Sequence, residues 1–123
     1  MKPSQLTAMN TDDLVKLFAT IAVEQDNAIL DNANARFTRL YRQMSEVVSE
    51  LKIREGDGRH ALVALYDYPN MQVRLKAAVH TLVVAPVEAR SLLEDIKAAK
   101  WYPQTAYAYG MLDALKEGRY IPS

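Results

Sequence analysis

Hydrophobic residues recur every three or four positions along this chain, the spacing that places them on one face of an α-helix. The first stripe follows Thr11, which is a suitable N-cap residue. Asp12 and Asp13 would occupy the first turn, where acidic side chains suit the helix dipole. The polar stretch 26–34 then predicts a turn. The stripe consists of Leu14, Leu17, Phe18, Ile21 and Ala22.

A second stripe extends over about four turns and predicts the longest helix of the chain. Arg42 and Glu46, and likewise Glu50 and Arg54, are four residues apart and of opposite charge, a spacing that lets side chains pair on a helix surface. The helix is expected to end at residues 55–58. Its stripe consists of Phe37, Leu40, Tyr41, Met44, Val47, Val48 and Leu51.

Turn residues divide the rest of the chain into shorter helices. Gly56 is expected to take the left-handed conformation that ends a helix, and Asp57 to cap a short helix from Gly58 to Tyr66. Three further helices are expected, with Asn70 and Pro86 at the starts of the first two and Gly118 after the end of the last. No segment shows the period-2 alternation of a strand.

The short connections predict that successive helices are antiparallel neighbours. The predicted fold class is therefore all-α, with about six helices in antiparallel hairpins. Residues 1–123 would form a single domain, with long N-terminal helices over 11–54 and helical hairpins over 57–118.

Composition narrows the classes of function. The chain has 123 residues, half of them hydrophobic, with fifteen basic and fifteen acidic residues. This balance argues against a surface built entirely for nucleic acid or anionic membrane. The absence of cysteine excludes disulfides, thiolate chemistry and cysteine-ligated zinc. The N-terminal residues have no apolar signal region and no run approaches the roughly 20 residues of a membrane span, so a cytoplasmic protein is expected.

The segment PNMQVRLKAAV resembles a HEAT or armadillo-type repeat. Asp67 and Pro69 form the turn between two helices, and the pattern V-R-x-x-A-A then runs from Val73 to Ala78. Small residues at such positions let neighbouring helices approach closely. The resemblance implies an α-α superhelix of one and a half to two repeats, capped by the long N-terminal helices.

Residues from about Leu14 to Pro122 resemble a bacterial family called the domain of unknown function 2019. The segments FTRLYRQMSEVVSELK, LVALYDYPNMQVRLKAA and YPQTAYAYGMLDAL carry this resemblance. It implies an armadillo-like fold and a bacterial source. It implies no activity, and there is no catalytic motif to carry over.

Catalytic and metal-binding patterns are missing from the sequence. His60 and His80 lie in no metal-ligand spacing, and Gly56-Asp57-Gly58 has no accompanying P-loop lysine. We therefore expect no cofactor, no metal and no enzymatic activity. An enzyme that assembles distant carboxylates with His60 or His80 stays open as an alternative. Arg74 is expected to pair with Asp67 or with carbonyls of the inter-helix turn.

Aromatic residues near the C-terminus are the first candidate binding surface. Tyrosine and tryptophan are frequent anchors at protein interfaces. The leading hypothesis is a non-enzymatic, protein-binding helical-repeat adaptor of a bacterial cell, with an immunity-like or antitoxin-like role as one version. The partner's identity is open, and so is self-association into a homo-oligomer. The expected binding residues are Trp101, Tyr102, Tyr109 and Tyr120, with Tyr107 partly in the core.

Basic residues form the second candidate surface. Arg36, Arg39 and Arg42 recur every three positions on the longest predicted helix. Helical-repeat proteins can bind phosphates along such a face. Nucleic-acid binding is therefore the alternative function. An extended version of this face would also include Arg59, Arg74 and Lys76.

Overall fold

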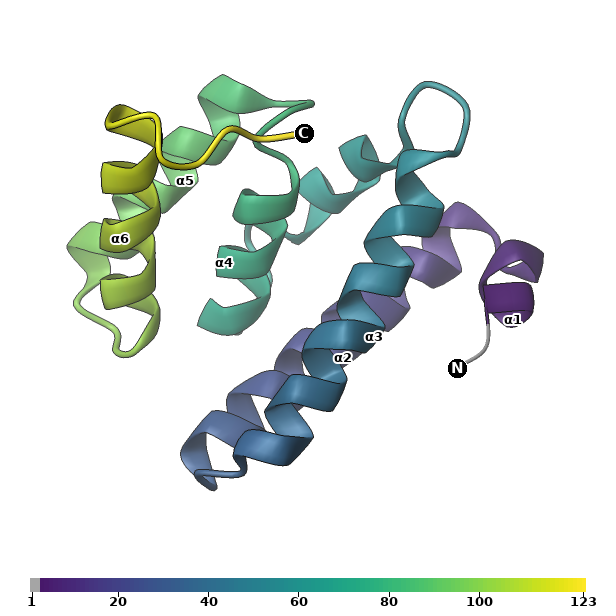
Figure 1. Ribbon diagram of the computed structural model, residues 1–123, viewed down its shortest axis with the longest axis horizontal. Helices are drawn as coiled ribbons and strands as arrows, with labels where there is room; N and C mark the ends of the chain where they lie inside the picture. Colours follow the sequence, from purple (N-terminus) through teal and green to yellow (C-terminus); the bar gives the residue numbers. More distant parts are fainter. Residues whose placement is uncertain (1–2) are drawn as a thin grey trace. The chain divides into compact units, whose positions relative to one another are not determined.

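The computed structural model describes residues 3–123, and within that range the backbone forms seven helices and no strand (Figure 1). The prediction of an all-α fold is confirmed at this level. The elements are α1 (Pro3–Ala8), α2 (Thr11–Leu30), α3 (Asn34–Lys52), the 3₁₀ helix η1 (Gly58–Leu65), α4 (Met71–His80), α5 (Pro86–Ala99) and α6 (Gln104–Lys116).

The chain divides into two compact units, Met1–Leu62 and Val63–Ser123, with the boundary inside η1. Unit 1 contains α1, α2, α3 and the first part of η1. Unit 2 contains the end of η1, then α4, α5, α6 and the C-terminal residues. The expectation that the whole chain is a single domain stays a prediction.

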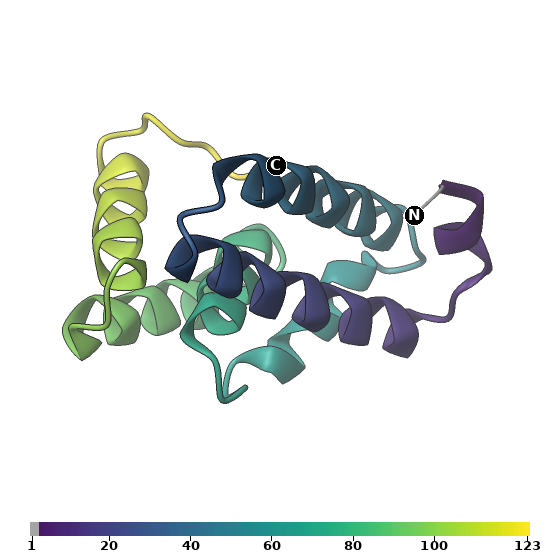
Figure 2. The ribbon, with the colours of Figure 1, turned by 90° about the horizontal axis from the view of Figure 1, so that it is seen from below.

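An antiparallel pair of helices, α2 and α3, forms the body of unit 1 (Figure 2). Helix α2 is capped by Asn10, whose side chain accepts a 2.8 Å hydrogen bond from the Asp13 N–H. The prediction that Thr11 is the N-cap is therefore wrong, because Asn10 supplies the acceptor and Thr11 is already helical. Helix α2 continues to Leu30, and the turn predicted within residues 26–34 lies at 31–33.

The extent of α2 past its hydrophobic stripe has a packing explanation. Gln25 and Ala28 are both buried, so the inward face of α2 continues through residues that interrupt the hydrophobic stripe. The Gln25 amide donates to the Met44 sulfur on α3 at 3.9 Å. In α3 the expected stripe holds at Leu40, Met44, Val47 and Leu51, but Tyr41 is 51% exposed.

Helix α3 ends at Lys52, with Ile53 as its C-cap. Gly56 does have a left-handed backbone, with φ of +71°, but it lies beyond the cap, so its predicted role as the residue that ends the helix is wrong. Gly58 is needed for a close approach, since a Cβ there would lie 2.7 Å from the Leu51 carbonyl oxygen.

Arg54 attaches α1 to α3. Its Nε donates to Glu50 at 2.8 Å, which confirms the predicted pair, and its Nη2 donates to the carbonyls of Leu6 and Met9 at 3.1 and 2.8 Å. These bonds tie the end of α1 to α3; the Leu6 carbonyl also accepts from the Met9 N–H at 3.1 Å. The six-residue helix was not predicted, because Leu6 is the one buried residue among 4–8 and makes no periodic stripe.

Asp57 caps η1 as predicted, accepting a 3.1 Å hydrogen bond from the Arg59 N–H. It also forms an ion pair with the Arg59 side chain at 2.7 Å. The hydrogen bond from that guanidinium lowers the pKa of the Asp57 carboxyl below its ordinary value of 3.8. The helix that follows has the tighter 3₁₀ geometry, which is usual in short connecting pieces.

Unit 2 is built from α4, α5 and α6, each started or stopped by a predicted residue. Asn70 caps α4 by accepting from the Val73 N–H at 3.1 Å, and Pro86 is in the first turn of α5. Gly118, with φ of +73°, follows the C-cap of α6. The core contains Leu75, Ala78, Leu82, Ala89, Leu93, Ile96 and Ala108.

Polar side chains are also buried in unit 2. The Gln104 amide on α6 donates to Gln72 on α4 at 3.0 Å. Lys76 of α4 is only 4% exposed, and its Nζ lies 4.9 Å from the centre of the Tyr107 ring on α6. Burial lowers the pKa of the Lys76 ammonium group below its ordinary value of 10.5.

Candidate functional site

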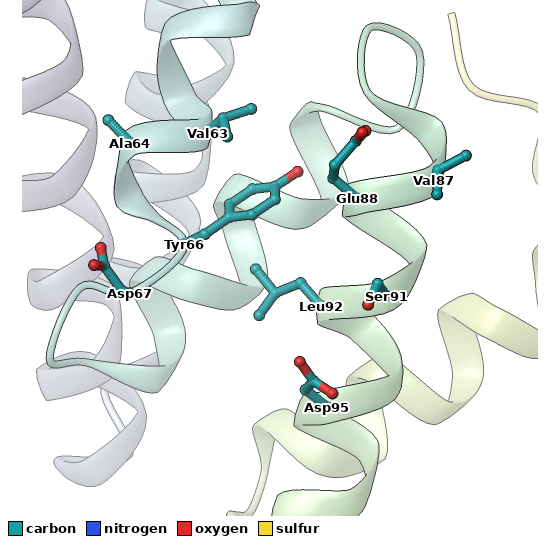
Figure 3. A pocket seen from close by; sticks show the side chains of 9 residues that line it. All are labelled: Val63, Ala64, Tyr66, Asp67, Val87, Glu88, Ser91, Leu92 and Asp95. Carbon is teal, nitrogen blue, oxygen red and sulfur yellow. The ribbon is translucent and has the colours of Figure 1, made fainter.

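An open groove with a volume of about 730 Å³ lies in unit 2, between residues 63–67 and helix α5 (Figure 3). Its two walls come from segments separated by about twenty positions in the sequence, brought together by the packing of α4 against α5. We call it the acidic groove. The residues that line it are Val63, Ala64, Tyr66, Asp67, Val87, Glu88, Ser91, Leu92 and Asp95.

The α5 wall is one face of that helix. Glu88, Ser91, Leu92 and Asp95 follow the spacing i, i+3, i+4 and i+7, which places them in a row along the helix. Leu92 is partly buried against the core, whereas Glu88, Ser91 and Asp95 are exposed. Val87 is 76% exposed and lines the same groove, so apolar surface is open to solvent there.

Tyr66 forms the opposite wall, and Figure 3 shows its ring reaching from residues 63–67 toward α5. Its hydroxyl lies 2.5 Å from the Thr81 hydroxyl. Thr81 has one proton, which it donates to the Ala77 carbonyl at 2.7 Å. Tyr66 is therefore the donor in its bond to Thr81. This hydrogen bond holds the hydroxyl of the half-buried Tyr66 and so orients its ring.

Tyr66 remains a neutral phenol in this setting. Burial raises the pKa of Tyr66 above its ordinary value of 10, the hydrogen bond to Thr81 opposes this, and the charge of Glu88 adds to it. A neutral ring offers a cation its negatively polarised face. The groove therefore combines a fixed aromatic surface with carboxylates.

The charge of the groove is entirely negative. Asp67, Glu88 and Asp95 line it, and none of its lining residues is basic. A smaller hollow of about 220 Å³ shares Asp67 and Asp95 and extends to Ile96 and Ala99. Arg74 lines this second hollow, and its Nε donates to the Tyr68 carbonyl at 2.6 Å. The expectation that Arg74 binds a carbonyl of the inter-helix turn is confirmed.

Unit 1 has a hollow of its own, about 390 Å³, between α1 and α3. Leu6 and Ile53 supply its apolar surface, and Glu46 and Glu50 its acidic groups. Glu50 is already held by Arg54 and by the Thr7 hydroxyl at 3.2 Å. The hollow therefore offers a ligand fewer available charged groups than the acidic groove.

The predicted aromatic residues lie at the surface of unit 2. Trp101 and Tyr102 lie in the connection between α5 and α6, Tyr109 lies on α6, and Tyr120 lies in the C-terminal segment; all four are exposed. The Lys97 Nζ lies 4.4 Å from the centre of the Tyr109 ring. Tyr107, expected to be partly in the core, is 52% exposed. Their role in binding stays a prediction.

The predicted basic face on α3 does not extend to all the residues that were assigned to it. Arg36, Arg39 and Arg42 lie on α3, and Arg36 forms an ion pair with Asp31 at 2.7 Å. Arg59 and Lys76 are buried. The extension of the face to those two residues is wrong, because burial keeps their charges from solvent phosphates.

Comparison with known proteins identifies the family. A family model described as "Domain of unknown function (DUF2019)" matches residues 12–116. The chain belongs to the DUF2019 family. This DUF2019 protein is also similar to a solved structure, the protein RPA1889 from Rhodopseudomonas palustris CGA009, with 53% identity and a TM-score of 0.94. The match covers 96% of this chain and 98% of that one. None of the curated proteins matches this DUF2019 chain.

The two histidines of the DUF2019 protein belong to different units. His60 is an exposed residue of η1 in unit 1, and His80 is the last residue of α4 in unit 2. Over residues 3–123, no three histidine, aspartate or glutamate side chains come together as metal ligands would. In the same range, none of the helices combines the length and the apolar character that crossing a bilayer requires.

Sequence reasoning missed the acidic groove of this DUF2019 protein. Glu88, Leu92 and Asp95 do have helical spacing, and that pattern could have marked a mixed acidic and apolar face on α5. Nothing in the sequence placed Tyr66 and Asp67 opposite that face. Their position depends on how α4 and α5 pack.

Proposed function

We propose that this DUF2019 protein is a non-enzymatic helical-repeat adaptor that binds a basic segment of a protein partner in the acidic groove. One observation carries the proposal: a groove of about 730 Å³ combines three carboxylates and an exposed valine, without a basic residue in its lining. Such a surface complements a segment with both cationic and apolar side chains.

The proposed architecture is a short HEAT-like or armadillo-like superhelix. Two features of unit 2 support it. Arg74 binds the carbonyl of Tyr68 in the turn before α4, and Ala77 and Ala78 are fully buried on α4. Both belong to the V-R-x-x-A-A pattern, so the pattern's arginine stabilises a turn and its alanines allow close helix packing.

The groove is better suited to binding than to acid–base catalysis. Glu88 and Asp95 are seven residues apart on α5, so their backbones are separated by about 10 Å along the helix axis. None of the residues that line the groove is histidine, the side chain that serves most often as a general acid or base. Raised further by burial, the pKa of Tyr66 also keeps its phenol protonated near neutral pH.

The proposed setting is the cytoplasm of a bacterium, and the partner is a protein with an exposed basic segment. An immunity-like or antitoxin-like role is one version of this proposal, in which the acidic groove would cover a basic functional surface of a toxin. Homo-oligomers remain compatible with it. The exposed residues Trp101, Tyr102, Tyr109 and Tyr120 would add contacts outside the groove.

A titration with simple charged peptides tests the binding mode. The ¹⁵N-labelled protein is mixed with a hexa-arginine peptide and, separately, with a hexa-glutamate peptide. We expect the arginine peptide alone to shift the amide signals of Glu88, Ser91 and Asp95. Raising the salt concentration from about 0.1 M to about 1 M should weaken binding of the arginine peptide, because the Debye length falls from about 10 to about 3 Å. Signals that stay unchanged at the groove would disprove the proposal.

The aromatic contacts have a separate test once a partner is identified. Trp101→Ala and Tyr109→Ala should weaken capture of that partner, since exposed aromatic anchors often contribute more than 1 kcal/mol each. Binding of hexa-arginine should be unchanged in both variants, which distinguishes the aromatic contacts from the groove. Full retention of partner affinity would show that these residues lie outside the interface.

Nucleic-acid binding is a second candidate, supported by the exposed positions of Arg39 and Arg42 on α3. With few cations available, only a few phosphates would be neutralised, so affinity should be weak and steeply salt-dependent. Gel shifts with single- and double-stranded probes at low salt test it. A retarded band that disappears with the Arg39→Gln/Arg42→Gln variant would support nucleic-acid binding by α3. The absence of any retarded band at low salt would disprove it.

A further inference from the structure

The charged groups of the acidic groove have a definite spacing along α5. Glu88 and Asp95 mark two carboxylate positions about two turns apart, and Leu92 lies between them on the same face. The ring of Tyr66 faces this row from the other wall, and Asp67 also lines the groove. The groove therefore alternates acidic, apolar and acidic positions along its length.

The groove also runs lengthwise along α5. The larger hollow takes α5 residues from Val87 to Asp95. The smaller hollow, which shares Leu92 and Asp95 and is also lined by Arg74, continues to Ile96 and Ala99. Together they follow α5 over nearly its full extent, Pro86–Ala99. An elongated occupant aligned with α5 fits this shape better than a compact ligand.

We propose that the occupant is an amphipathic helix of another protein, with two basic side chains seven residues apart and an apolar side chain between them. This inference rests on the proposed function and specifies the partner's pattern. A helix lying along α5 has the same rise per residue, so its positions i and i+7 fall opposite Glu88 and Asp95. Its apolar residue at i+3 or i+4 then meets Leu92 and the Tyr66 ring.

The exposed apolar surface agrees with a helical occupant. Val87 is 76% exposed at one end of the groove, and an amphipathic helix would cover it with its own apolar stripe. The carboxylates would remain near the rim, where pairing with arginine or lysine contributes to register and association rate. Arginine suits the site especially, since its planar group can also stack on Tyr66.

A second copy of this chain does not supply the required helix. Among basic residues seven positions apart within one described helix, there is a single pair, Arg90 and Lys97 on α5. Leu93, the apolar residue between them, is fully buried, and Lys97 already contacts the Tyr109 ring. The complementary pattern must therefore come from a different protein.

Two synthetic peptides of equal composition test the inference. Both are capped, alanine-rich helices with two arginines and two leucines. The matched peptide has arginines at i and i+7 with leucines at i+3 and i+4; the isomer moves the second arginine to i+5, which turns it onto a different face. Circular dichroism verifies equal helicity, and calorimetry measures binding to the full-length protein.

We expect the matched peptide to bind about tenfold more tightly than the isomer. The Glu88→Gln/Asp95→Asn variant should lose about tenfold in affinity for the matched peptide, because its two side chains stay polar but no longer carry charge. The control variant Glu24→Gln/Glu94→Gln removes two exposed charges that do not line the groove and should bind within about twofold of the unaltered protein.

The outcomes separate this inference from the proposed function. Equal binding of the two peptides, with both weakened by Glu88→Gln/Asp95→Asn, would overturn the helical register while leaving a basic-segment groove. Equal loss of affinity in the control variant would also overturn the register, because attraction would then depend on net charge alone. Failure of both peptides, together with hexa-arginine, would overturn the groove itself.

Discussion

The two units of this DUF2019 protein differ in the largest side chains that they bury. In unit 1, two long helices bury large side chains, among them Phe18, Leu14 and Met44. In unit 2, three shorter helices bury leucines such as Leu75 and Leu93 together with alanines such as Ala89. Buried alanines occur in unit 1 as well, for example Ala22, so the units differ chiefly in Phe18, the largest fully buried side chain. Unit 1 should therefore be the more sensitive to a shortened side chain.

The units differ in buried charge as well. Unit 1 buries Arg59 beside its carboxylate partner Asp57, with 2.7 Å between them. Unit 2 buries Lys76 against the face of an aromatic ring. Burial lowers the pKa of the Lys76 ammonium group, so the folded protein holds that charge at a net cost. The hydrogen bond from Arg59 lowers the pKa of the Asp57 carboxyl, so the charge of Asp57 is stabilising. Removal of the charge should consequently have opposite effects at Lys76 and Asp57.

The largest expected effect is that of Phe18→Ala in unit 1. Phe18 is fully buried, so truncation removes buried area and leaves a cavity, at a cost of about 3 to 5 kcal/mol in the free energy of unfolding. Denaturation with guanidinium measures this cost. Leu30→Ala, at a position 76% exposed on the same helix, should change stability by less than about 0.5 kcal/mol. Similar values for both variants would contradict the tight packing of unit 1.

In unit 2 the corresponding change is Ala89→Leu. Ala89 is fully buried in the core, so a larger side chain must displace its neighbours, at a cost of about 1 to 3 kcal/mol. Ala98→Leu on the exposed side of α5 adds the same atoms and should be close to neutral. If Ala89→Leu is stabilising, the close contacts attributed to unit 2 are looser than described.

A smaller effect, of opposite sign, is expected for Lys76→Met. Methionine fills a similar space without a buried charge, so the variant should be more stable by about 1 kcal/mol at neutral pH. Burial lowers the pKa of Lys76 in the folded state below 10.5, so the unfolded chain binds this proton more tightly. The free-energy cost of burying the charged Lys76 is therefore present in full at pH values below its folded pKa. It disappears at pH values above 10.5, where Lys76 is neutral in both the folded and the unfolded chain.

The advantage of Lys76→Met should therefore shrink as the pH rises through that window. Chemical denaturation at a series of pH values measures the difference between the variant and the unaltered protein. Lys16→Met, at an exposed position of α2, is the matched control and should show neither the advantage nor its decline. A loss of stability in Lys76→Met at neutral pH would mean that the charge itself is stabilising.

The smallest effect is expected for Asp57→Asn in unit 1. Asparagine keeps the cap on the Arg59 N–H, tolerates the left-handed backbone with φ of +61°, and offers the guanidinium an amide oxygen in place of the carboxylate. Because the Asp57 side chain is also 26% exposed, water compensates part of the lost charge, and the cost should be about 0.5 kcal/mol. The Arg59 hydrogen bond lowers the pKa of Asp57 below 3.8, so this stabilisation is present above pH 3.8 and is lost as the pH falls through the folded pKa.

Denaturation at neutral and acidic pH tests the Asp57 prediction, since the difference between variant and unaltered protein should vanish in acid. The matched control is Asp31→Asn, which removes the carboxylate that pairs with Arg36. Because the Asp31 side chain is 64% exposed, this change should have almost no effect on stability at neutral pH. A larger loss for Asp31 than for Asp57 would reverse the ranking of buried and exposed pairs.

Particular residues show why the predictions succeeded or failed. Asn70, Pro86 and Gly118 determine helix ends through local backbone chemistry, and all three act as predicted. Two residues led to wrong predictions of burial. Gln25 is polar but fully buried, and Tyr41 lies in the predicted hydrophobic stripe but is 51% exposed. Burial depends on what packs against a position, and that information lies elsewhere in the chain.

The sequence by itself determined that this protein is helical, where α4 and α5 begin and α6 ends, and to which family it belongs. The helical character and these helix ends follow from spacing and capping over a few neighbouring residues, and the family follows from similarity along the chain. Only the tertiary structure placed Tyr66 and Asp67 opposite Glu88, Leu92 and Asp95 and buried the charge of Lys76. Contacts between distant residues arise when the apolar faces of helices pack together. One pattern of apolar positions is compatible with several ways of packing the helices, so the pattern alone does not determine these contacts.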